Sequence, residues 1–177
     1  LVGFLFFVYG VPFLAEGLAR SVSIEYERAL GEGLKATYLE YLDVDSTQSK
    51  RIQKFYDHLD YESPYDVKVF VVESDVVNAF ALPGGFIVVF SGILDIMDDK
   101  EELAGLLAHE VSHVNERHSL RLLSRDLSTY LLLASLTGDI GGFSSVILEN
   151  SNMINSLSFS RKFEKDADLE GLELMEV

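Results

Sequence analysis

HEVSH, residues 109–113, lies within a run of sequence whose apolar residues recur at helical spacing. The apolar face of this run consists of Leu103, Leu106, Leu107, Val111 and Val114. Asp98 or Asp99 is placed to cap a helix here, and Glu101 and Glu102 fall in its first turn, where the helix dipole favours acidic side chains. The pattern therefore predicts a helix that carries all five residues of HEVSH.

His109 and His113 are four residues apart, so on a helix they project from neighbouring turns of one face. Their ring nitrogens could then bind one metal ion, each at about 2 Å. Glu110 is displaced around the helix, so its carboxylate could take a proton from a water molecule activated by that ion. The alternative is that these are ordinary polar residues on a solvated helix face. The HExxH spacing favours a zinc site.

A catalytic zinc site needs a third protein ligand, and no third histidine follows HEVSH at the HExxHxxGxxH spacing. Glu164 is the candidate ligand, because it lies on a predicted final helix with Asp168 one turn later on the same face. Asp168 could accept the free ring N–H of a zinc-binding histidine and so fix its tautomer. Taken alone, a Glu and an Asp four residues apart more often form a solvated face. The presence of HExxH in the same chain favours the interpretation that Glu164 is a metal ligand and that Asp168 supports a histidine ligand.

Three short segments rich in Val and Phe precede the HEVSH helix and predict strands. Residues 67–71 alternate in the manner of a strand, and residues 76–81 and 86–90 flank the turn sequence Leu82-Pro83-Gly84-Gly85. We expect a small antiparallel or mixed sheet that contains this hairpin.

The remaining periodic segments predict helices. Ser23 could cap one that reaches Tyr38, and Asp45 to Thr47 could cap a second that ends before Ser63-Pro64. Residues 120–136 form a third, residues 138–142 read as a flexible glycine break that could allow a lid, and a last helix starts near residues 156–160. That last helix is expected to turn Phe163, Ala167 and Leu172 inward. The fold class is therefore α+β and mostly helical.

Composition restricts the function classes. The 177 residues include no cysteine, so disulfides, thiolate zinc sites and cysteine nucleophiles are excluded. The formal net charge of −15 would repel nucleic acid, so we expect no nucleic-acid binding. The length and the 48% hydrophobic content suit a single domain, predicted over residues 16–177.

The first fifteen residues carry no charge and are apolar on every side of a helical wheel. This is typical of the end of a transmembrane helix, so residues 1–15 predict membrane association. The alternative is a helix that packs on the domain or on a neighbouring molecule.

Three segments resemble the signatures of one known family. HEVSH, NAFALPGG at residues 78–85 and SRKFEKDAD at residues 160–168 are similar, in order and approximate spacing, to those of the HtpX-type membrane-associated zinc metallopeptidases. That family also contains the CAAX prenyl endopeptidases and the Oma-type and BepA-type quality-control proteases. The resemblance covers roughly residues 67–174.

The resemblance implies a gluzincin-like fold with one zinc ion per chain. By it, His109, His113 and Glu164 bind the zinc, Glu110 is the general base, and Asp168 supports a ligand. It further implies that Asn78, Ala79, Phe80 and Ala81 form a strand that pairs with an extended polypeptide substrate, although a plain core hairpin is the alternative. Relatives usually continue beyond the segment at residues 167–175, so we expect this chain to be truncated at its C-terminus.

Two further residues are weaker candidates for the cleft. Arg161 lies one turn before Glu164 and could stabilise an oxyanion, while a surface ion pair is equally compatible with its position. His118 could approach the metal or the substrate, or simply end a helix. Arg117, Arg121 and Arg125 form a stripe at helical spacing that could meet anionic lipid or an acidic peptide, or be solvated.

Together these features predict a zinc-dependent metalloendopeptidase that cleaves unfolded or membrane-associated proteins. We expect it in the cell envelope, with the catalytic domain on the periplasmic side. The alternative is a latent or inactive module that binds misfolded envelope proteins without cleaving them.

Overall fold

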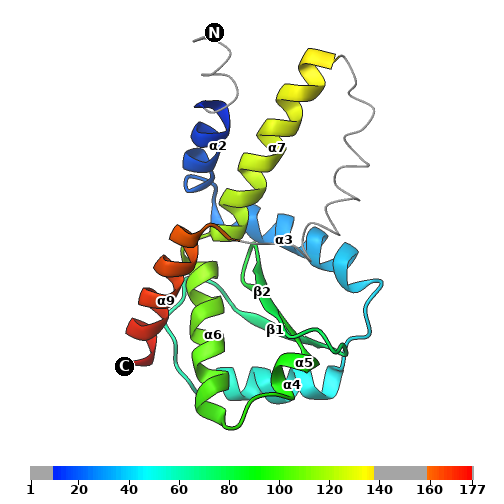
Figure 1. Ribbon diagram of the computed structural model, residues 1–177, viewed down its shortest axis with the longest axis vertical. Helices are drawn as coiled ribbons and strands as arrows, with labels where there is room; N and C mark the ends of the chain where they lie inside the picture. Colours follow the sequence, from blue (N-terminus) through cyan, green and yellow to red (C-terminus); the bar gives the residue numbers. More distant parts are fainter. Residues whose placement is uncertain (1–9, 138–158, 177) are drawn as a thin grey trace.

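The computed structural model describes residues 10–137 and 159–176. The predicted glycine break at residues 138–142 and most of the apolar segment 1–15 lie outside these ranges. The helices are α2 (Val11–Ala19), α3 (Ile24–Leu39), α4 (Ser46–Tyr56), α5 (Ser91–Leu94), α6 (Lys100–Asn115), α7 (His118–Thr137) and α9 (Arg161–Met175), and the strands are β1 (Lys68–Val72), β2 (Ala79–Leu82) and β3 (Phe86–Phe90). The described part is thus mostly helical with one small sheet, which confirms the α+β prediction (Figure 1).

The three strands form a mixed sheet in the order β1-β3-β2. β3 pairs in parallel with β1, from Lys68 opposite Phe86 onward, and antiparallel with β2 through the predicted hairpin turn. The prediction that β2 starts at Val76 is wrong by three residues. Val76 and Val77 are 52% and 55% exposed, because this part of the chain still runs outside the sheet.

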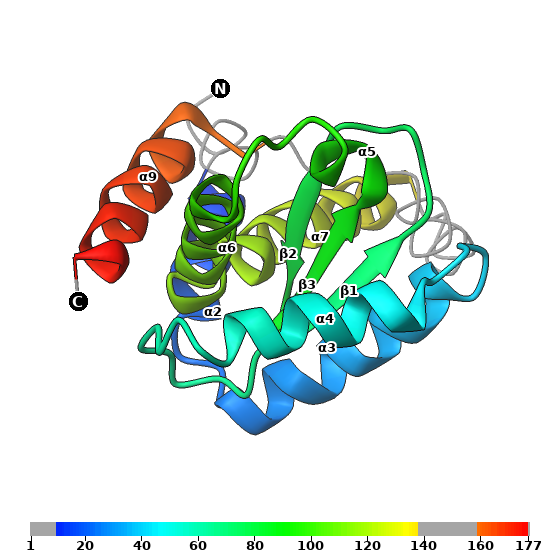
Figure 2. The same ribbon diagram turned by 90° about the horizontal axis from the view of Figure 1, so that it is seen from below.

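The sheet is buried on both faces. One face packs on α4 and α6, through Val71, Ala81, Val89, Leu107 and Val111 among others. The other face carries Phe80, Phe86 and Val88 and packs against Tyr38 of α3. Figure 2 shows the sheet between these helices, with α9 beside α6 on the side away from the strands. Because both faces are covered, β3 reads as a continuous apolar run instead of an alternating one.

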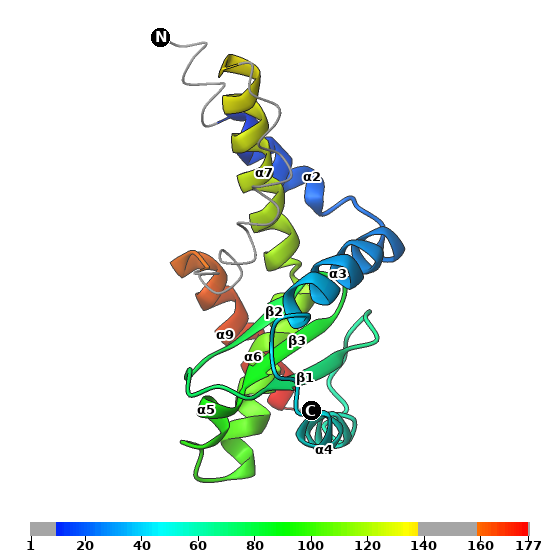
Figure 3. The same cartoon turned by 90° about the vertical axis from the view of Figure 1, so that its right-hand side faces the viewer.

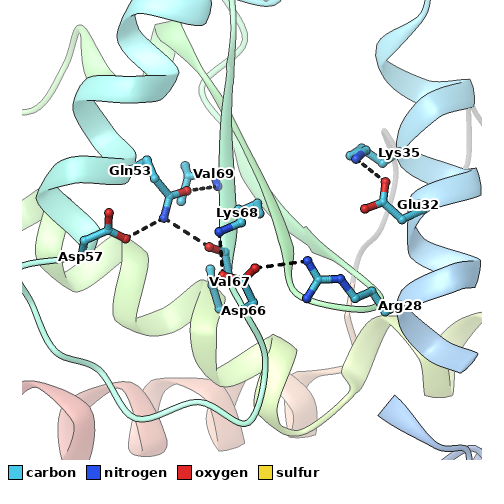
Figure 4. Close-up of polar contacts among 9 residues, drawn as sticks. All are labelled: Arg28, Glu32, Lys35, Gln53, Asp57, Asp66, Val67, Lys68 and Val69. Carbon is cyan, nitrogen blue, oxygen red and sulfur yellow. Dashed lines mark hydrogen bonds and ion pairs between the residues drawn. The ribbon is translucent and has the colours of Figure 1, made fainter. Parts of the chain in front are cut away.

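The free side of β1 is closed by side chains of α4. Gln53 accepts the backbone N–H of Val69 and donates to the carbonyl of Val67, as Figure 4 shows. The hydroxyl of Ser49 accepts the backbone N–H of Val71, and the carbonyl of Val71 accepts the backbone N–H of Asp45. Residues 45–53 therefore bond to four of the backbone groups on this side of β1, namely the carbonyls of Val67 and Val71 and the N–H groups of Val69 and Val71.

Local capping explains where the helices begin. Ser23, Asp45, Asp99 and Ser160 each accept a backbone N–H from the first turn of the helix that follows. Phe163 and Ala167 of α9 are buried as predicted, but Leu172 is 59% exposed, so its predicted inward orientation is wrong. The residue of α9 that contacts α6 closely in this region is Gly171.

Helices α2 and α7 lie side by side and project away from the sheet (Figures 1 and 3). Glu16 of α2 is ion-paired with Arg121 of α7 at 2.9 Å, and Arg117 donates to the carbonyls of Arg20 and Val22. These two members of the arginine stripe are therefore engaged within the chain. Among the helices of the described residues, none is both long enough and apolar enough to cross a bilayer.

Candidate metal centre

Helices α6 and α9 bring three possible ligands together. His109 and His113 face each other on α6, with their Nε2 atoms 3.0 Å apart. The Oε2 atom of Glu164, from the first turn of α9, lies 3.5 Å from Nε2 of His109. One ligand atom from each of the three residues can be chosen so that all lie within 4.8 Å of one another. The arrangement joins residues separated by more than fifty positions in the sequence.

A glycine allows the two helices to approach. A Cβ atom on Gly171 of α9 would lie 3.2 Å from the backbone nitrogen of His109 and 3.4 Å from the carbonyl carbon of Ala108. A larger residue at this position would push the backbones apart. Because Glu164 is two turns earlier on the same helix, this contact helps to set its distance from His109.

The donor set fits a zinc ion. Two imidazole nitrogens and one carboxylate oxygen are a ligand combination found in catalytic zinc sites, and ligand atoms at tetrahedral angles around zinc are about 3.3 Å apart. The observed separations of 3.0 Å and 3.5 Å lie on either side of that value. Burial, followed by the charges of His109 and His118, lowers the pKa of His113 to about 3, so this ring stays neutral and able to bind a metal.

The second ring nitrogen of His109 faces Asp168. The Nδ1 atom of His109 lies 3.0 Å from Oδ1 of Asp168, one turn after Glu164 on α9. A carboxylate in this place accepts the Nδ1 proton and leaves the Nε2 lone pair directed toward Glu164 and His113. The structure thus brings Asp168 to the place predicted for it, beside a histidine of HEVSH.

Glu110 points from α6 toward the strand side of the site and is 4% exposed. Burial, followed by the negative charge of Glu164, raises the pKa of Glu110 to about 8, while the backbone N–H of Ala81 acts in the opposite direction. Its Oε2 atom is buried without a hydrogen-bond partner among the described residues. A carboxylate oxygen in this state is suited to accept a proton.

These side chains open onto a cleft of about 210 Å³. It is lined by Val77, Asn78, Ala79, Phe80, Ile93, Leu106, His109, Glu110, His113, Phe159 and Glu164. The predicted segment Asn78–Ala81 therefore borders the same cavity as the three possible ligands, except that Ala81 is fully buried behind it.

The register of the hairpin decides which backbone groups of β2 face the cleft. The N–H of Phe90 donates to the carbonyl of Asn78, so in this antiparallel pair the residues 78, 80 and 82 bond to β3. Ala79 and Ala81 consequently turn their N–H and C=O groups outward. The carbonyl of Ala81 accepts the hydroxyl of Ser119, whereas Ala79 borders the cleft.

The two weaker candidates lie outside this cavity. Arg161 is exposed at the first position of α9 and is not among the residues that line the cleft. His118 is 0% exposed and lies behind His113, with the two Nδ1 atoms 2.9 Å apart. His118 therefore has no access to a molecule in the cleft.

Phe159 has a place in the site that the sequence did not indicate. Its ring stacks on His113 with centroids 4.1 Å apart and borders the cleft. The only signal available was an aromatic residue directly before the helix cap Ser160, which does not distinguish a site residue from a core residue.

Comparison with known proteins agrees with this geometry. The model of peptidase family M48 matches residues 46–177. The chain is similar to the mitochondrial metalloendopeptidase OMA1 of Schizosaccharomyces pombe, at 41% identity over 107 residues that cover 59% of this chain and 31% of the relative. It is 36% identical over 108 residues to the Arabidopsis thaliana protein of the same name, covering 61% of this chain and 22% of that one.

A second group of relatives is bacterial. The beta-barrel assembly-enhancing protease of Escherichia coli K12 is 30% identical over 126 residues, which cover 60% of this chain and 24% of the relative. The chain thus spans less than a third of the length of each of these relatives.

Proposed function

Because this chain belongs to peptidase family M48, whose model matches residues 46–177, we propose that it is a zinc-dependent metalloendopeptidase. His109, His113 and Glu164 would hold one zinc ion, in the arrangement of a gluzincin. The observation that carries this proposal is the meeting of these three donors beside Glu110, which has a buried carboxylate oxygen without a partner among the described residues.

Each residue then has a distinct task in peptide hydrolysis. A bound zinc ion would act as a Lewis acid toward the scissile carbonyl and would make the attacking water more acidic. Glu110 accepts a proton from that water as the oxygen attacks the carbonyl carbon, and it then delivers the proton to the nitrogen of the departing amine. A nearby dication favours the charged form of Glu110 and so opposes the effect of its burial on its pKa.

Strand β2 is the proposed docking place for the substrate. Ala79 turns its backbone N–H and C=O away from β3, and it borders the cleft that also contains Glu110. An extended polypeptide could add to β2 through these groups, which would hold a peptide bond beside the ligands. Extended pairing requires an unfolded segment, so we propose that the substrates are unfolded or membrane-associated proteins.

We also propose membrane attachment through the N-terminal segment. In the described part of that segment, Phe13 and Leu14 are 74% and 53% exposed, and Leu18, further along the same helix α2, is 68% exposed. Apolar side chains in contact with solvent favour burial in a lipid surface. We accordingly propose that the protein lies in the cell envelope, with its catalytic domain in the periplasm.

The decisive experiment compares zinc content and peptide hydrolysis in two variants. Glu110→Gln should keep stoichiometric zinc in elemental analysis and lose hydrolysis by a factor of about 10²–10⁴, because only proton transfer is removed. Glu164→Ala should lose most of the zinc, since it removes one of three ligands. Glu101→Gln makes the same chemical change on the exposed first turn of α6 and should leave both properties intact.

Two outcomes would contradict the proposal. Full hydrolysis by a folded Glu110→Gln protein would refute the role of the base, and absence of stoichiometric zinc in the parent protein would refute the metal site. Binding of unfolded protein without chelator-sensitive cleavage would instead support the alternative, a module that binds misfolded proteins.

A further inference from the structure

A second histidine lies behind one of the proposed ligands. His118 is the first residue of α7, and a break at Arg117, whose φ is 55°, separates it from the end of α6. After this break Nδ1 of His118 lies 2.9 Å from Nδ1 of His113, five residues earlier in the sequence. His118 is 0% exposed, so no substrate can reach it.

The contact determines where the protons lie when His113 binds a metal. Nε2 of His113 faces Nε2 of His109, so it is the nitrogen that would bind the ion and must carry a lone pair. The proton of the neutral His113 ring is then on Nδ1, and it points at Nδ1 of His118. His118 must accept it and must carry its own proton on Nε2.

We propose that His118 is a positioning residue that holds His113 in the tautomer whose Nε2 lone pair faces the metal. The inference rests on the proposed zinc site and extends it to the residue behind the second ligand. It gives each histidine ligand its own hydrogen-bond acceptor: Asp168 for His109 and His118 for His113.

The ring of His118 is fixed from the side of α9. Phe163 stacks on it with centroids 4.2 Å apart and planes 13° from parallel, and the guanidinium of Arg121 lies 4.2 Å from the centroid of the same phenyl ring. Phe163 directly precedes Glu164. Helix α9 thus supplies Glu164 as the third proposed ligand and also packs, through Phe163, against His118, which orients His113.

The geometry does not favour His118 as a ligand itself. Its Nδ1 atom is directed at the nitrogen of His113 that points away from His109. Its other nitrogen, Nε2, is buried and has no hydrogen-bond partner among the described residues. A role in orienting His113 accounts for the Nδ1 contact and for the burial of the ring.

Two substitutions distinguish positioning from packing. His118→Asn keeps a carbonyl oxygen that can accept the Nδ1 proton of His113, whereas His118→Leu fills space without an acceptor. Zinc affinity, measured on the full chain by competition with a chelator of known affinity, should fall about 10–100-fold in His118→Leu and should be largely restored in His118→Asn. In the cobalt-substituted proteins, the visible absorption spectrum should differ from that of the parent protein in His118→Leu and should be close to it in His118→Asn.

His58→Leu is the matched control. His58 is exposed and is the only other histidine of the chain besides His109, His113 and His118, so its loss should leave zinc affinity unchanged. Equal affinity in His118→Leu and the parent protein would overturn the inference, as would an equal loss in His118→Asn and His118→Leu.

A measurement on the unmodified protein covers the case in which the variants do not fold. Nitrogen-15 NMR of the zinc-loaded chain should show His113 protonated on Nδ1 and His118 protonated on Nε2. A proton on Nδ1 of His118 would refute the inference. Absence of stoichiometric zinc in the parent protein would refute the proposed function itself, so the two failures are distinguishable.

Discussion

At the scale of single residues, a second polar cluster joins three distant parts of the chain. Glu27 of α3 is 1% exposed and accepts hydrogen bonds from the hydroxyl of Tyr65 and the backbone N–H of Gly84. Its ion-pair partner is Arg117, at 3.3 Å, in the short segment between α6 and α7. Burial and the hydrogen bond to Glu27 raise the pKa of Tyr65 well above its usual range. The cluster therefore ties α3 and the β2–β3 turn to the residue that precedes His118.

Removal of Arg117 should be strongly destabilising. Arg117→Met leaves the carboxylate of Glu27 buried without its cation, which costs about 3–5 kcal/mol of unfolding free energy. Arg20→Met removes a cation from an exposed pair with Glu116, whose side chains are 59% and 41% exposed, and should change stability by at most about 1 kcal/mol. Urea unfolding of both variants checks this, and similar values for the two would contradict it.

The single residues of the site differ in how far the sequence could predict them. HExxH spacing was sufficient to single out His109, Glu110 and His113, and a carboxylate pair on a later helix indicated Glu164 and Asp168. The contact between His118 and His113 was not predictable, because it depends on a break between α6 and α7 at Arg117, a residue with positive φ that is not glycine.

At the scale of elements, the close packing of α3 on the hairpin turn depends on Gly31. A Cβ atom at this position would lie 1.9 Å from the carbonyl oxygen of Pro83, which is far below van der Waals contact. No periodicity in the sequence marks Gly31 as different from Gly33, two residues later, where a Cβ atom would meet nothing within 4 Å. The two glycines differ only in their tertiary surroundings, because Gly31 lies against Pro83 and Gly33 does not.

Substitution of these glycines should have opposite effects. Gly31→Ala forces the turn away from α3 and should cost about 1–3 kcal/mol. Gly33→Ala should stabilise the chain by up to about 1 kcal/mol, because alanine is the better helix former. Thermal unfolding of the pair measures both, and a Gly31→Ala protein as stable as the parent would show that the turn can shift without cost.

The elements themselves were largely predictable, because their signals are local. Caps and apolar spacing predicted most helices, and β3 was predicted with its observed bounds. The start of β2 and the exposure of Leu172 were predicted incorrectly, since both depend on which surface a neighbouring element covers.

At the scale of the whole molecule, the candidate metal centre joins two parts of the chain that meet only through tertiary structure. HEVSH lies on α6, which packs on the sheet, while Glu164 and Asp168 lie on α9 at the outer side of α6 (Figure 2). The sequence named these residues but could not place the helices, since helix packing angles follow from contacts such as that of Gly171. A bound ion would connect the two helices directly.

Zinc should therefore stabilise the folded chain. With free zinc at about a thousand times its dissociation constant, binding to the folded state raises the free energy of unfolding by about 4 kcal/mol. For a chain of this size, that increase corresponds to a rise in Tm of roughly 8–16 °C. Calorimetry with and without chelator measures the difference. Glu164→Ala is the control and should show little zinc-dependent change, whereas a parent protein that binds zinc without any rise in Tm would contradict the expectation.

The closure of β1 by α4 has a consequence for self-association. A sheet with two bare sides can recruit further copies of itself and grow by edge-to-edge aggregation. Here Gln53 and Ser49 bond to the carbonyl of Val67 and to the N–H groups of Val69 and Val71, so these groups are not available to a foreign strand on that side. If extended chains dock on β2 as proposed, the closure of β1 leaves each copy only one side of its sheet on which a strand can add, so the same chains cannot link the copies into a continuous sheet.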